Sequence, residues 1–159
     1  MPRRDQARLT GAEQQALVLI REIRSQIAAG DIPNEVNTPA RLAHYVITLY
    51  HGHAQLRMSR IVPELGVSMR TLQRSFRQTF RKSMKAYQTD TRLRFAQYLL
   101  SNDPELKMSV IAKHLGYNDP NVFERFFRDH TDSSPHAWSA AKQARRLLRD
   151  FGDKDKSND

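Results

Sequence analysis

The sequence has no cysteine, few glycines and no long apolar run. Without cysteine, the chain has no disulfide framework, thiol nucleophile, cysteine-ligated zinc or iron–sulfur cluster. The longest apolar run, residues 16–20, is too short to cross a membrane, and no secretory apolar stretch follows the first residues. We therefore expect a cytoplasmic protein with no membrane contact, built from 159 residues as one domain with short extensions.

Acidic residues are scarce in one part of the chain. The whole sequence has 26 Lys and Arg and 17 Asp and Glu, a net charge of +9. Residues 55–95 hold ten cations and two acids, whereas residues 1–40 are neutral, residues 96–141 are −2 and residues 142–159 are +2. Three or four Arg would indicate a solvated helix face. This larger excess, interleaved with Leu and aromatic residues, indicates a surface that binds a polyanion.

The expected fold class is all-α, because no segment alternates polar and apolar residues for long enough to form a strand. Thr10 and Glu13 form a capping box ahead of a helix over residues 11–29, and Gly30 ends it. The helix carries one apolar stripe, Ala16, Ile20, Ile23 and Ile27.

A linker over residues 31–37 separates this N-terminal segment from the rest of the chain. Thr38 then caps a second helix that begins at Pro39, ends near Gly52 and is expected to bury Leu42, Val46 and Leu49. These signals predict an N-terminal helix and linker over residues 1–37, a domain over residues 38–141 and a charged, disordered tail over residues 142–159.

From residue 58 onward the sequence repeats itself at an offset of 50 residues, which becomes 51 after the turn. Each copy comprises a short helix, a glycine turn, a second helix and a Ser-capped third helix. The matching pairs are Met58 and Met108, Ile61 and Ile111, Leu65 and Leu115, Gly66 and Gly116, Leu72 and Phe123, Arg74 and Arg125, Phe76 and Phe127, Ser83 and Ser134, and Tyr87 and Trp138.

Each copy predicts a helix-turn-helix, in which the second helix enters the major groove of DNA. In the first copy Ser68 caps that helix. One face carries Met69, Leu72, Phe76 and Phe80, and the other carries Arg70, Gln73, Arg74 and Arg77. Arg presents a forked donor pair that suits guanine, and Gln makes paired contacts with adenine. The alternative is an amphipathic helix whose Arg only keep it soluble; the duplication argues against it.

In the second copy Asp119 caps the helix and Pro120 follows. The predicted inward residues are Val122, Phe123, Phe126 and Phe127, and the outward ones are Asn121, Glu124, Arg125 and Arg128. A long helix from Met84 to about Ser101 joins the copies and spans roughly 25 Å at 1.5 Å per residue. Two reading helices held that far apart could enter successive major-groove segments, about 34 Å apart.

These residues resemble the DNA-binding domain of the AraC/XylS family of bacterial transcription regulators. The match is strongest over residues 111–128 with Ser134 and Pro135, which is similar to the family pattern Ile-Ala, Gly-Phe/Tyr, Phe-x-Arg-x-Phe-Lys/Arg and Ser-Pro. Residues 66–76 are similar to the family's first helix-turn-helix. With Arg92, Ala96 and Leu100 of the joining helix, the resemblance covers about residues 40–140.

The resemblance implies two helix-turn-helix subdomains of homeodomain-like type joined by a long helix, reading adjacent major-groove segments. Carried over by position, Arg70, Thr71, Gln73 and Arg74 would read bases in the first subdomain, and Pro120, Asn121 and Arg125 would lie at the DNA in the second. Together with the outward faces, this makes the candidate DNA-binding residues Ser68, Arg70, Thr71, Gln73, Arg74 and Arg77, and Asn118, Asn121, Glu124, Arg125 and Arg128.

Four positions depart from the family pattern. Arg81 and Asp132 stand where the family has Gly after each recognition helix, and a left-handed cap costs more free energy without Gly. Pro63 lies inside a helix, where it removes a backbone donor and should distort the turn. Ser139 stands where the family often has Arg.

Other candidate sites are weaker. His51 and His53 could bind a metal, and His44 lies seven residues before His51. The His51 and His53 pair flanks Gly52 with no carboxylate nearby in sequence, so we interpret the pair as part of a solvated loop and expect no metal. Trp138 corresponds to Tyr87 and is expected to be a core residue. No phosphate-binding Gly loop or nucleophile elbow occurs, so we expect no cofactor and no enzyme.

The leading hypothesis is a sequence-specific, double-stranded DNA-binding transcription regulator acting at the bacterial nucleoid. We expect an activator that also contacts RNA polymerase, although no residue distinguishes activation from repression. The alternatives are a protein-interaction module and a non-specific nucleic-acid-binding protein. The residues before the domain are too few to enclose an effector cavity of about 300 Å³ or more.

The stripe of the N-terminal helix leaves three arrangements open. Ala16, Ile20, Ile23 and Ile27 have the spacing of a helix–helix seam, but two heptads are too few for an independent coiled coil. The stripe packs onto the domain, pairs with its copy in a second chain, or docks another protein. A chain that already holds two reading helices has no need to dimerise, so we favour a monomer.

Overall fold

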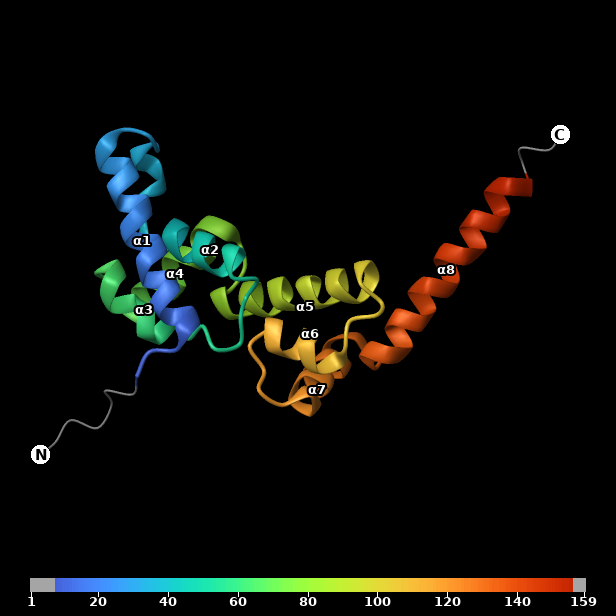
Figure 1. The fold of residues 1–159 in the computed structure, drawn as a ribbon. Coiled ribbons are helices and arrows are strands. Elements are labelled where there is room, and N and C mark those ends of the chain that lie inside the picture. Colours follow the sequence, from blue (N-terminus) through green and yellow to red (C-terminus); the bar gives the residue numbers. More distant parts are fainter. Residues whose placement is uncertain (1–7, 156–159) are drawn as a thin grey trace, which may run out of the picture. The chain divides into compact units, whose positions relative to one another are not determined.

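The computed structural model describes residues 8–155 and is all-helical over that range, which confirms the expected fold class (Figure 1). Eight α-helices and one 3₁₀ turn follow one another within these described residues. They are α1 (Gly11–Ala29), η1 (Asn34–Val36), α2 (Pro39–Leu49), α3 (Met58–Leu65), α4 (Met69–Phe80), α5 (Met84–Asn102), α6 (Met108–His114), α7 (Pro120–Thr131) and α8 (Pro135–Asp155).

The chain divides into two compact units between Arg92 and Leu93, inside α5. We call them the N-terminal unit and the C-terminal unit. The boundary differs from the expected division at residues 37 and 141, because α1 belongs to the core of the N-terminal unit and α8 to that of the C-terminal unit. Each unit contains one of the two sequence repeats.

The N-terminal helix packs onto its own unit, as the first of the three sequence hypotheses held. The capping box is present: the backbone N of Glu13 donates to Thr10 Oγ1 at 3.2 Å, and the backbone N of Thr10 donates to Glu13 Oε2 at 3.0 Å. The Glu13 carboxylate is fully buried and accepts a 2.9 Å hydrogen bond from Arg57 Nε. Ala16 and Ile20 are also fully buried, so α1 is part of the core.

Helix α2 lies between α1 and α4 in the contacts of the N-terminal unit, and its buried residues differ from those predicted. Leu42 and Val46 are buried as expected, but Leu49 is 55% exposed, so that prediction was wrong. Ala43 and Ile47 are buried instead. At 100° per residue, the buried face is centred between Ala43 and Val46, which leaves Leu49 at its edge.

Gly52 allows α5 to approach the loop after α2. It has φ +63°, and a Cβ there would lie 2.2 Å from the carbonyl oxygen of Gln88 in α5. The Gly52 carbonyl accepts a 2.7 Å hydrogen bond from Arg92 Nε, and Gln88 Nε2 donates to the carbonyl of Leu56 at 2.7 Å. These contacts fix the first half of α5 on the N-terminal unit.

The C-terminal unit has its own core around α6, α7 and the second half of α5. Ile111, Leu115, Phe123 and Phe127 are fully buried. Trp138 packs edge-on against Phe127 with ring centroids 5.9 Å apart, which confirms that it is a core residue. Ser139 is buried, and its hydroxyl donates a 3.3 Å hydrogen bond to the carbonyl of Leu100. The small serine side chain fits this buried position.

The tail differs from its prediction. α8 continues to Asp155, so the expectation of disorder is wrong for residues 142–155; residues 156–159 lie outside the described range. Residues 140–152 of the helix are exposed, and Leu147, Leu148 and Phe151 are between 59% and 72% exposed. No helix in residues 8–155 is long and apolar enough to span a membrane.

Candidate nucleic-acid interface

A tight turn places α4 after α3 in the N-terminal unit. α3 runs through Pro63 and ends at Gly66, whose φ of +71° reverses the chain. Ser68 then caps α4: its Oγ accepts from the backbone N of Thr71 at 3.1 Å and donates to Thr71 Oγ1 at 2.9 Å. Glycine adopts this positive φ without steric cost, so the turn follows from the sequence.

Helix α4 has one buried face and one exposed face. Leu72 and Phe76 are fully buried, and Met69 and Phe80 are partly buried against the same core, as predicted. The exposed face carries Arg70, Gln73, Arg74 and Arg77. Within residues 8–155 these four side chains make no hydrogen bond or ion pair, so their donors are available to a ligand.

The acids near α4 are paired with other cations. Glu64 accepts a 3.2 Å contact from Arg21 Nε of α1, and Asp90 pairs with Lys82. These are the two acids of residues 55–95. Because neither contacts an Arg of α4, the positive charge of that helix is not neutralised by the acids of its own segment.

The second helix-turn-helix is built by different residues. Gly116 has φ +90°, and the backbone N of Tyr117 donates to the carbonyl of Ala112 at 2.9 Å, which closes the end of α6. Asp119 caps α7, accepting a 2.9 Å hydrogen bond from the backbone N of Asn121, and Pro120 occupies the first helical position. Pro is favoured there because its missing N–H would have no helical partner.

Helix α7 presents a mixed face. Asn121, Arg125 and Arg128 are exposed as predicted, whereas Glu124 is only half-exposed. Asn118, in the turn before the helix, is also exposed. Phe123 and Phe127 are fully buried and Phe126 partly so, but Val122 is 44% exposed, so its assignment to the core was wrong. The buried face runs through residues 123, 126 and 127, and Val122 lies one residue outside it.

Helices α4 and α7 each end in a left-handed residue that is not Gly. Arg81 has φ +57° and Asp132 has φ +56°, and their backbone N atoms donate to the carbonyls of Arg77 and Arg128 at 2.9 Å. Arg81 and Asp132 therefore adopt the left-handed conformation that Gly would favour at these positions, and both carry backbone strain.

The structure places the three histidines in different surroundings. His44 is stacked between Phe80 and Tyr87, at centroid distances of 4.3 and 4.7 Å, and His53 Nδ1 accepts from the backbone N of Gln55 at 3.2 Å. Desolvation by burial lowers the pKa of His44, His51 and His53. His51 is exposed, as a solvated loop requires, whereas His53 is partly buried, which differs from that expectation. His44 is partly buried within its aromatic stack. Residues 8–155 contain no group of three or more potential His, Asp or Glu ligands.

Sequence reasoning missed three features that matter to the site. The close approach at Gly52 depends on contacts with α5, and the His44 stack joins residues far apart in the chain. The third is a basic pocket on α8, which the expectation of a disordered tail concealed. The spacing of Lys142, Arg146 and Arg149, at i, i+4 and i+7, is a signal that could have revealed it.

Known proteins resemble the part of the chain that holds the two helix-turn-helix repeats. A family model described as a helix-turn-helix domain matches residues 61–141. The Msm operon regulatory protein of Streptococcus mutans is 32% identical over 82 residues, which are 52% of this chain and 29% of that protein. The chain thus spans less than a third of the length of that curated relative.

Solved structures share the fold. The C-terminal domain of AraT, a response regulator from Geobacillus stearothermophilus, has a TM-score of 0.59 and 25% identity, covering 65% of this chain and 84% of that one. The C-terminal domain of the response regulator yesN from Fusobacterium nucleatum has a TM-score of 0.56 and 26% identity, covering 62% and 94%. A DNA-binding transcriptional dual regulator from Escherichia coli K-12, at 20% identity, a TM-score of 0.54 and coverage of 67% and 94%, shares the fold.

Proposed function

This chain belongs to the AraC-type helix-turn-helix family of DNA-binding transcription regulators, and from that premise we propose that it binds double-stranded DNA sequence-specifically, reading two adjacent major-groove segments with α4 and α7. The family is one of regulators rather than enzymes. The observation that carries the proposal is the face of α4, where three Arg and one Gln are exposed at i, i+3, i+4 and i+7 without intramolecular partners in the described chain.

The two helices would contribute differently to recognition. Arg70, Arg74 and Arg77 carry un-neutralised charge, so α4 would provide most phosphate attraction and guanine readout. α7 offers Asn121 for adenine and Arg125 for guanine beside the half-exposed Glu124. The amide and carboxylate on α7 favour base selection over non-specific affinity.

Binding to a selected duplex and to a random duplex at one salt concentration tests the proposal. Specific regulators prefer their site by about 10³-fold or more. Footprinting of the selected site should show two protected segments one helical turn apart, about 10 base pairs from centre to centre. A preference near one would contradict sequence-specific recognition, and a single protected segment would contradict reading by both helices.

Non-specific nucleic-acid binding is the second candidate, because the net +8 of residues 55–95 is itself sufficient for attraction to a polyanion. The same measurement separates the two. A non-specific protein binds both duplexes equally and loses affinity for both as salt rises.

A contact with RNA polymerase and a monomeric state on an asymmetric DNA site complete the proposal. The polymerase contact follows from the expectation of an activator. The monomeric state rests on the architecture, because a chain with two reading helices can span two groove segments without a second copy. Co-sedimentation of the protein, its selected duplex and polymerase tests the first. If the protein does not contact polymerase, it will sediment with the duplex but not with polymerase.

A further inference from the structure

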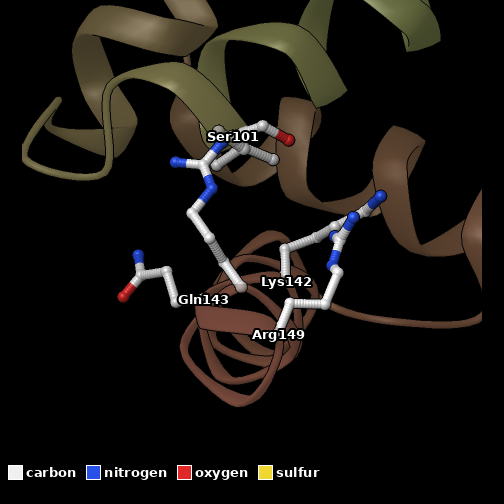
Figure 2. Close-up of a pocket in the computed structure, with 6 residues that line it drawn as sticks. Ser101, Lys142, Gln143 and Arg149 are labelled. Carbon is white, nitrogen blue, oxygen red and sulfur yellow. The ribbon is translucent and has the colours of Figure 1, made fainter. Parts of the chain in front are cut away.

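Three cations line a pocket of the C-terminal unit that belongs to neither recognition helix. The pocket has a volume of about 200 Å³ and lies between the end of α5 and α8 (Figure 2). Its lining residues are Leu100, Ser101, Lys142, Gln143, Arg146 and Arg149. Four of them follow residue 141, where the match to the helix-turn-helix family ends, so nothing in that match accounts for the pocket.

The pocket is positively charged and has no acid in its lining. Lys142, Arg146 and Arg149 share one side of α8 at i, i+4 and i+7, and none makes an ion pair within residues 8–155. Figure 2 shows Lys142 and Arg149 extending from the same side of α8, with Ser101 across the pocket. Like charges at these spacings on one helix repel one another, and an anion bound among them would relieve that repulsion.

Neighbouring contacts hold part of this lining in place. The Lys142 ammonium lies 5.3 Å from the centroid of the Trp138 ring, which is part of the core. Gln143 Nε2 donates to Ser139 Oγ at 3.4 Å, and Ser139 is anchored to Leu100. The base of the pocket is therefore set by buried residues, and the guanidinium groups project from it.

We propose that this pocket binds a phosphate group. The volume lies below the about 300 Å³ of small drug-sized pockets, so it suits a compact anion rather than a large apolar ligand. Guanidinium forks match phosphate oxygens with paired hydrogen bonds, and the Ser101 hydroxyl and Lys142 ammonium add further donors. The phosphate comes from the DNA backbone flanking the reading helices or from a free phosphorylated metabolite.

Two variants of adjacent residues separate a site from general charge. Arg146→Gln removes a cation that lines the pocket, whereas Arg145→Gln removes an exposed cation of the same helix that does not. Both variants lose one positive charge and no buried contact, so both are expected to fold, which a circular dichroism melt of the full chain checks.

Calorimetric titration with pyrophosphate at low salt tests the free-ligand source. We expect saturable binding by the unchanged chain and by Arg145→Gln, and at least a tenfold weaker interaction for Arg146→Gln. The salt dependence of binding to a random duplex tests the DNA source. A lost backbone contact lowers the slope of log K against log salt by about 0.9 for Arg146→Gln, with Arg145→Gln keeping the original slope.

Either difference between the variants supports the proposal and identifies the source. The proposal is overturned if the two variants behave alike in both titrations. In that case the cations only offset the negative end of the α5 helix dipole, and Arg146→Gln would lower the melting temperature without changing anion binding. Random duplex binding needs no operator, so this outcome is independent of sequence-specific recognition.

Discussion

Under the proposed function, single side chains on α4 and α7 would determine how these two helices share the contacts with DNA. Arg74 and Arg125 occupy equivalent positions of the two repeats and are both exposed. The N-terminal unit carries the excess of positive charge, while Glu124 and Asp129 lie next to or near Arg125 along α7. The two equivalent residues therefore allow a matched comparison.

We expect Arg74→Ala to weaken binding to the selected duplex by about 1–3 kcal/mol and to relax the preference at one base pair. Arg125→Ala should do the same to a smaller extent, because α7 carries less net charge. Fluorescence anisotropy with a panel of single-base variants measures both effects. Arg41→Ala, an exposed cation of α2, is the control for lost charge. A larger loss for Arg125→Ala would contradict the charge argument.

The left-handed caps give a second prediction at this scale. Arg81 has φ +57° and its side chain is exposed, so replacing it with Gly removes backbone strain and no buried contact. We expect Arg81→Gly to raise the free energy of unfolding by about 1 kcal/mol in urea denaturation. Asp132→Gly should gain less, because Asp tolerates the left-handed region better than Arg. A loss of stability in Arg81→Gly would show that its side chain contributes to the fold.

Burial of His44 makes stability depend on pH. Desolvation between Phe80 and Tyr87 lowers its pKa below 6.5, so the unfolded chain binds protons more readily than the folded one. The contribution of neutral His44 to the free energy of unfolding is fully present above pH 6.5, and it is lost as the pH falls through the folded pKa. The pKa values of His51 and His53 are lowered too, so these residues also make the fold less stable as the pH falls. Urea melts from pH 8 downward should show a weaker pH dependence for His44→Phe, which keeps the stack; parallel curves would contradict it.

At the scale of the helices, the sequence predicts most of what local chemistry controls. Thr10, Ser68 and Asp119 cap the helices they were expected to cap, and the period of 3.6 residues identifies the buried face of α4. The errors at Leu49 and Val122 occur at the edges of buried faces, where the neighbouring element decides exposure. The helix over residues 142–155 was missed because the many charged residues of this segment were interpreted as a disordered tail, although apolar residues recur among them at helical spacing.

Contacts between distant elements could not be predicted, and Gly52 shows why. The sequence predicts that Gly52 lies at the end of a helix. It does not predict that a Cβ at this position would lie 2.2 Å from the carbonyl oxygen of Gln88, because that distance depends on how α5 packs against the loop. The candidate DNA-binding faces were predictable because they are the complement of a local apolar stripe. The basic pocket required the packing of α8 against α5 within the C-terminal unit.

Gly52 supplies the prediction for this scale. Gly52→Ala would place a methyl group against the α5 backbone, whereas Gly66→Ala meets no atom within 4 Å. Both residues have positive φ, so both variants carry left-handed strain of about 1–2 kcal/mol. We expect Gly66→Ala to cost that amount and Gly52→Ala clearly more, measured by chemical denaturation. Equal losses would show that α5 can move away without cost.

For the whole molecule, the N-terminal helix decides between a monomer and a dimer. The seam that would pair two chains is the stripe that α1 uses within its own unit, where Ala16 and Ile20 are fully buried and Ile23 packs against the core. A second chain could take this stripe only if α1 left the core, which would also expose the Glu13 carboxylate and break its contact with Arg57. Self-association through α1 therefore competes with folding of the N-terminal unit.

We accordingly expect the full chain to sediment as a monomer, with a urea unfolding midpoint that does not change with protein concentration. Ile20→Ala should lower the free energy of unfolding by about 2–5 kcal/mol, because it opens a cavity at a fully buried position. Val18→Ala, on the exposed side of α1, is the control and should change stability little. If α1 joined two chains instead, mass action would make the midpoint rise with concentration. Removal of residues 1–36 would then abolish the dimer, and the selected DNA site would be two-fold symmetric rather than asymmetric.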